Sequence, residues 1–131
     1  VRVVDERGRE TEARVYHTAS DGKPWTPAGA YERLASLNRH LFHTSGRYVI
    51  EAPPGTFRIE ATKGFEYAVA RQEVEIRAGQ TTTVTVALTR LVNLREKGWH
   101  SGSNHVHLNY AGNLHNTPEN MMLMAGAEDV N

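Results

Sequence analysis

Apolar and polar residues alternate along most of the first 94 residues, in short runs. Phe57, Ile59 and Ala61 alternate with Arg58 and Glu60. A period of two places one apolar face on a β-strand, and that face has to be buried against another layer. Similar runs occur at Val1–Val4, Ala13–His17, Gly46–Ala52, Val74–Arg77 and Val84–Leu88.

Turn residues separate these runs at short and regular spacing. The strongest signal is Ala52–Gly55, because proline presets φ and glycine tolerates positive φ. Asp5–Gly8 and Ala78–Gln80 are similar. Short strands at such spacing predict an antiparallel sandwich or barrel. We therefore expect residues 1–97 to form a mainly β domain, an antiparallel Greek-key β-sandwich of about seven strands.

One stretch departs from this pattern. Asp21–Ser45 is long for a connection, and Leu34, Leu37 and Leu41 recur within it at helical spacing. We interpret it as an excursion between two strands that could contain a short helix.

The sequence pattern changes from Gly98 onward. Ser103–Leu108 is a strand candidate, residues 109–116 form a polar loop, and Thr117-Pro118-Glu119 is a helix start. Thr117 can cap exposed amides, and Pro118 stands where its missing N–H does no harm. Residues 98–131 are thus predicted to be a β–loop–α unit that opens a parallel α/β domain.

The expected helix, from Thr117 to about Glu128, carries an apolar stripe that includes Met121 and Met124. An apolar stripe needs cover. Without the rest of such an α/β domain, we expect the helix to fold back on the sandwich, to pair with a neighbouring chain, or to stay poorly ordered.

Composition excludes several classes of protein. The 131 residues hold 15 basic and 15 acidic side chains, so there is no concentrated positive field for nucleic acid. The chain has no cysteine, which excludes disulfides, thiolate chemistry and cysteine-based zinc sites. No apolar run approaches the ~20 residues of a membrane-spanning helix. No signal peptide is visible, but we expect a secreted or periplasmic bacterial protein.

The residues that carry candidate chemistry are His105-Val106-His107. On a strand, residues i and i+2 share a face, so two imidazoles could offer nitrogens to one metal ion. Asn109, Tyr110 and His115 in the following loop could complete a pocket. On spacing alone, two histidines on an edge strand are the better interpretation, because a zinc-type site needs three or four ligands.

Two resemblances extend this interpretation. Gly98–Gly112 together with Asn116–Asn120 resembles the start of the PHP (polymerase and histidinol phosphatase) metallohydrolase domain, closest to the branch of carbaryl-hydrolase-like esterases. Upstream, Gly46–Tyr48, Pro54–Phe57 and Lys63–Tyr67 resemble a carboxypeptidase-regulatory-like, prealbumin-type sandwich. Together the two resemblances span nearly the whole chain.

The PHP resemblance implies that residues 98–131 are the N-terminal β–α fragment of a truncated α/β barrel. In the intact protein, that barrel would hold two or three Zn, Mn or Fe ions that activate water against an ester, amide or phosphoester. His105 and His107 match the first two metal ligands of that family, and its other ligands would follow Asn131. The catalytic set would be incomplete, so we expect this fragment to be inactive and to bind no metal tightly. Its partners would be the remainder of the hydrolase domain and a small ester or phosphoester substrate. Many relatives have Asp-Leu where this chain has Ser103-Asn104. Two alternatives therefore stay open: the metal site is tuned differently from that of the relatives, or it is degenerate.

The alternative is a stand-alone β-sandwich module that binds carbohydrate or protein. Its binding patch would be an exposed aromatic surface around Trp25 and Tyr31. A transthyretin-type hydrolase or carrier shares the sandwich, but the chain has no equivalent of that family's C-terminal tetrapeptide.

Overall fold

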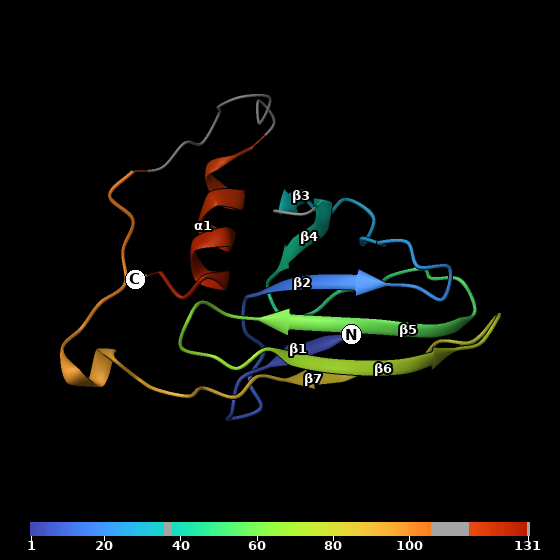
Figure 1. Ribbon diagram of the computed structural model, residues 1–131, viewed down its shortest axis with the longest axis horizontal. Coiled ribbons are helices and arrows are strands. Elements are labelled where there is room, and N and C mark those ends of the chain that lie inside the picture. The colour runs from blue at the N-terminus through green and yellow to red at the C-terminus, as the bar shows by residue number, and fades with distance from the viewer. Residues whose placement is uncertain (36–37, 106–115, 131) are drawn as a thin grey trace.

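The computed structural model describes residues 1–35, 38–105 and 116–130. Within them the protein is mainly β, as expected, with seven strands and one C-terminal α-helix (Figure 1). The strands are β1 (Arg2–Val4), β2 (Ala13–Thr18), β3 (Glu32–Ala35), β4 (Arg39–Thr44), β5 (Gly55–Thr62), β6 (Ala70–Ile76) and β7 (Thr85–Ala87). The short 3₁₀ helix η2 (Arg95–Lys97) and the helix α1 (Pro118–Ala127) follow.

Five strands form one antiparallel sheet in the order β3-β4-β2-β5-β6. The pairs β2–β5 and β5–β6 follow the predicted alternation. Val15 stands opposite Ala61, and Phe57 stands opposite Val74. Each of these strands directs its apolar positions to the same side, so the sheet has one apolar face.

The second sheet is a pair of short strands, β1 and β7, and these run parallel. The sequence predicted antiparallel strands only. The Arg2 amide donates to the Val84 carbonyl at 2.8 Å, and the Leu88 amide donates to the Val4 carbonyl at 2.8 Å. A pairing between strands about 80 residues apart leaves no trace in the local turn pattern from which the prediction was made.

The strand predicted at Gly46–Ala52 is not a separate element. Its first residues lie beside β1, where Arg47 forms an isolated antiparallel bridge with Arg2. The Val3 amide donates to the Gly46 carbonyl at 2.7 Å. The segment thus flanks β1, but the pairing ends after Tyr48.

One apolar core lies between the two sheets. The largest side chains buried in it come from both layers, so neither sheet could bury its apolar face alone. They are Val3, Val15, Phe42, Phe57, Ile59, Val86 and Leu88.

The possible helix within Asp21–Ser45 is a β-hairpin instead. Strands β3 and β4 pair antiparallel, with Leu34 opposite His40. Leu34 is 60% exposed while Leu41 is buried, so the leucines do not share one face. Leu37 lies outside the described residues. Asn38 enters β4 with φ 56°, a left-handed conformation that suits asparagine in turns.

Helix α1 begins as predicted. Thr117 is its N-cap and accepts a hydrogen bond from the Asn120 amide at 3.2 Å, with Pro118 as the first helical residue. The helix folds back on the five-stranded sheet against β2 and β4 (Figure 1). Of the three arrangements expected for its apolar stripe, the structure has the first. No helix in the described ranges is long and apolar enough to cross a membrane.

Candidate functional site

The histidine pair lies at the edge of what the structure describes. His105 is exposed, and its carbonyl accepts a hydrogen bond from the Ser103 hydroxyl at 3.2 Å. Residues 103–105 have no regular secondary structure, and the rest of the predicted strand is not described. Outside the described residues lie four predicted site residues, His107, Asn109, Tyr110 and His115.

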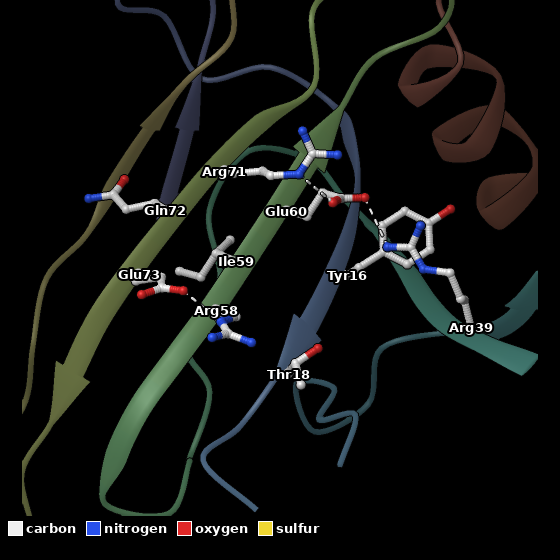
Figure 2. A pocket seen from close by; sticks show the side chains of 9 residues that line it. All are labelled: Tyr16, Thr18, Arg39, Arg58, Ile59, Glu60, Arg71, Gln72 and Glu73. Atoms are coloured by element: carbon white, nitrogen blue, oxygen red, sulfur yellow. Dashed lines mark hydrogen bonds and ion pairs between the residues drawn. The ribbon is translucent and has the colours of Figure 1, made fainter. Parts of the chain in front are cut away.

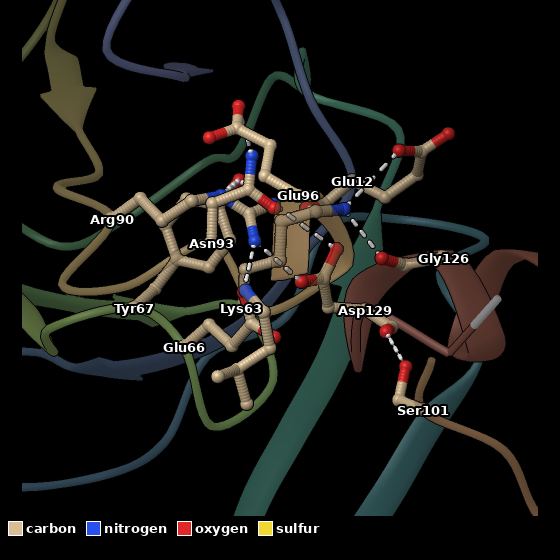
Figure 3. Close-up of polar contacts among 11 residues, drawn as sticks. Glu12, Lys63, Glu66, Tyr67, Arg90, Asn93, Glu96, Ser101, Gly126 and Asp129 are labelled. Carbon is tan, nitrogen blue, oxygen red and sulfur yellow. Dashed lines mark hydrogen bonds and ion pairs between the residues drawn. The ribbon is translucent and has the colours of Figure 1, made fainter. Parts of the chain in front are cut away.

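The structure does define how the C-terminal segment is attached to the sheet. At the end of β5, the buried Lys63 points at the last turn of α1 (Figure 3). Its ammonium group donates to the Gly126 carbonyl, and to the Glu12 carbonyl at 3.2 Å. A cation at a helix C-terminus satisfies carbonyls that lack an intrahelical partner and complements the helix dipole.

The residue after Lys63 also belongs to this junction. Gly64 has φ +51°, and its amide donates to the Ala127 carbonyl at 3.2 Å. A Cβ at this position would lie 2.5 Å from the Glu128 carbonyl oxygen. The end of α1 can approach the sheet this closely only because residue 64 is glycine.

Arg90 forms the second attachment, just beyond β7. Its guanidinium group pairs with Glu66 at 2.5 Å and with Asp129 at 3.1 Å (Figure 3). It also lies over the ring of Tyr67, 4.3 Å from the centroid. Its two carboxylate partners come from distant parts of the chain and leave no local pattern.

A third contact holds the same end of α1 from β2 and β4. The Glu128 carboxylate accepts from Arg14 at 3.1 Å and lies 3.4 Å from the His43 imidazole. Glu128 and Asp129 therefore fix the end of the helix to the sheet from two sides. Spacing alone identified neither carboxylate as an anchor.

Replacing Lys63 by methionine tests this attachment. Methionine keeps the apolar stem but leaves the Gly126 carbonyl without its cation, which costs about 1–3 kcal/mol. We expect faster hydrogen exchange for the amides of α1 and little change in the core strands, measured by mass spectrometry. The matched control is Lys23→Met, because the Lys23 side chain is exposed. Equal exchange in both variants would contradict the role of Lys63.

A cavity of about 390 Å³ opens beside this junction. Phe65, Leu94 and Trp99 supply its apolar side chains. Its polar edge is formed by Glu66, His100, Ser101, Glu128 and Asp129. The cavity therefore lies where the first 97 residues meet the C-terminal segment.

A second cavity, of about 260 Å³, lies on the face of the five-stranded sheet away from the core (Figure 2). Glu60 on β5 pairs with Arg39 and with Arg71, each at 2.9 Å. The Arg39 guanidinium lies 4.0 Å from the centroid of the Tyr16 ring. Each of these charged groups already has an ion-pair partner, and exposed pairs of this kind contribute little stability.

Trp25 and Tyr31, the alternative binding patch, have different surroundings. Trp25 packs against the core, and its carbonyl lies 3.1 Å from His17 Nδ1. Tyr31 lines a small cavity beneath α1 together with Leu123 and Met124. Because the Trp25 side chain packs against the core, this arrangement weighs against an exposed aromatic platform.

Comparisons with family models, with curated proteins and with solved structures found no match to this chain. Within residues 1–35, 38–105 and 116–130, no three His, Asp or Glu side chains are grouped closely enough to hold a metal ion.

Proposed function

We propose that this chain is the accessory sandwich and the incomplete first segment of a PHP-type metal-dependent hydrolase. The intact protein would hydrolyse an ester, an amide or a phosphoester. The observation that carries the proposal is the order of His105-Val106-His107, a polar loop, and a helix that starts at Thr117-Pro118. In this arrangement the mainly β unit would be a Greek-key sandwich of the prealbumin type, and the C-terminal segment the opening of an α/β barrel.

The donor atoms fit a divalent metal of the Zn, Mn or Fe class. Neutral imidazole nitrogens are ligands for all three ions. Two histidines fill only part of a coordination sphere, so further ligands would have to come from elsewhere in the intact protein. When bound, such an ion would supply Lewis-acid activation of a water and of the scissile group.

The first 97 residues would contribute position rather than chemistry. Lys63, Arg90 and Arg14 hold the end of α1 against the sheet. The segment that leads to His105 is attached as well, because the Ser101 hydroxyl donates to the Asp129 carbonyl. The sandwich would thereby limit the orientations open to the metal-binding segment.

Calorimetric titration of this chain with zinc tests the metal assignment. We expect weak binding that is lost in the His105→Ala/His107→Ala double variant. The control is His40→Ala. His40 lies on β4 beside Glu32 and does not belong to the segment that contains His105 and His107. Tight stoichiometric zinc with turnover of a chromogenic ester by this chain would contradict the expected incomplete site.

The natural gene product that contains this chain tests the activity. After loading with Zn, Mn or Fe, it should hydrolyse chromogenic esters, amides or phosphoesters, and the double variant should not. Absence of hydrolysis with all three substrate classes, or full activity in the double variant, would overturn the proposal.

A further inference from the structure

Three large apolar side chains lie exposed around the 390 Å³ cavity. Phe65 is fully exposed, Trp99 is 71% exposed and Leu94 is 39% exposed. We call these three residues the Trp99 surface. A cluster of exposed apolar side chains with a polar edge marks a surface that another group covers.

The charged residues beside this surface are already paired. Arg90 binds both Glu66 and Asp129, and Glu128 binds Arg14. A charged ligand would have to displace these internal partners, at the cost of leaving each displaced group without its counter-charge. An apolar protein surface fits this environment better, because it can cover the rings and leave the ion pairs at the rim intact.

The position of the surface points to one occupant. The C-terminal segment enters at the edge of the cavity through His100 and Ser101, and α1 ends at the same edge through Glu128 and Asp129. The Ser101 hydroxyl links these two segments by donating a hydrogen bond to the Asp129 carbonyl. The cavity is therefore continuous with the interface that α1 already makes with the sheet.

We propose that the Trp99 surface is the docking surface for the remainder of the α/β domain of the same polypeptide. This inference rests on the proposed function, since that function supplies the occupant. The sandwich and the hydrolase domain would then share an apolar interface built around Trp99 and Phe65, with the Arg90 ion pairs at its edge.

Carbene footprinting read by mass spectrometry tests the inference, because carbenes label any exposed side chain. The natural gene product is compared with the 131-residue chain. We expect labelling of Trp99 and Phe65 to fall several-fold in the gene product. Val49 is the internal control, because it is 82% exposed and lies outside this cavity. Its labelling should not change.

Equal labelling of Trp99 in both samples would overturn the inference. So would protection of Trp99 in the 131-residue chain that increases with its concentration, because a second copy would then be the occupant. Hydrolysis is measured separately on the same gene product. If Trp99 is protected in the gene product but no substrate is hydrolysed, the docking surface stands and the proposed function is refuted. If substrate is hydrolysed but Trp99 is labelled equally in both samples, the proposed function stands and the docking surface is refuted.

Discussion

Replacing Phe57 by alanine is expected to lower the free energy of unfolding by about 3–5 kcal/mol, the usual cost of removing a buried phenylalanine. Phe57 is 1% exposed, and its ring lies 4.9 Å from the ring of His17. The side chain fills the space between the two sheets, so its removal loses transfer free energy and leaves a cavity. Urea denaturation followed by circular dichroism at neutral pH measures the change.

The matched control for this prediction is Phe65→Ala. The same atoms are removed there from a fully exposed site. Exposed substitutions of this kind usually change stability by less than about 0.5 kcal/mol. If the two variants were destabilised equally, the assignment of Phe57 to the core would be wrong.

The second large effect concerns acid. His17 is buried, with Nε2 2.8 Å from the Tyr48 hydroxyl and Nδ1 3.1 Å from the Trp25 carbonyl. A carbonyl can only accept, so Nδ1 carries the proton and Nε2 accepts from Tyr48. The pKa of His17 is lowered to about 4, chiefly by burial; the hydrogen bond to the Trp25 carbonyl opposes this shift, and the N-terminal ammonium group adds to it.

The direction of the pH dependence follows from this lowered pKa. The unfolded chain takes up a proton on His17 near pH 6.5, whereas the folded chain does so only near pH 4. The contribution of His17 to the free energy of unfolding is therefore fully present above pH 6.5. It falls as the pH drops toward 4, and below that pH His17 causes no further loss of stability. The loss by pH 4 should be about 3 kcal/mol.

The variant His17→Gln isolates this contribution. Glutamine can donate and accept hydrogen bonds but does not titrate. The unfolding free energy of the variant should therefore fall less between pH 7 and pH 4 than that of the parent chain. The neighbouring Tyr48 does not interfere, because burial raises its pKa and it stays protonated throughout. The absolute stability of the variant is not the readout. Parallel pH profiles for the two chains would contradict the role of His17.

The sequence predicted those elements whose signals are local. The alternation at Phe57–Ala61 becomes β5, and the Thr117-Pro118 start becomes the capped N-terminus of α1. In both cases the physical cause acts within a few residues, as a two-residue period or as a side chain that accepts from a nearby amide.

The features that the sequence did not reveal depend on distant partners. Leu34 and Leu41 have helical spacing, but Leu34 is exposed and Leu41 is buried, and the pairing of β3 with β4 overrides the local period. The role of Arg90 depends on Glu66 and Asp129, which only the fold brings together around it. Of the predicted metal pair, only His105 lies within the described residues.

The parallel pairing of β1 with β7 has a mechanical consequence. Because the two strands point in the same direction, a force that pulls the start of the chain away from the segment after β7 slides one strand along the other. The backbone hydrogen bonds across this pair, such as those from Arg2 to Val84 and from Leu88 to Val4, would then be stretched together rather than one by one. The layer with the shortest strands is thus the one that resists extension when the protein is under tension.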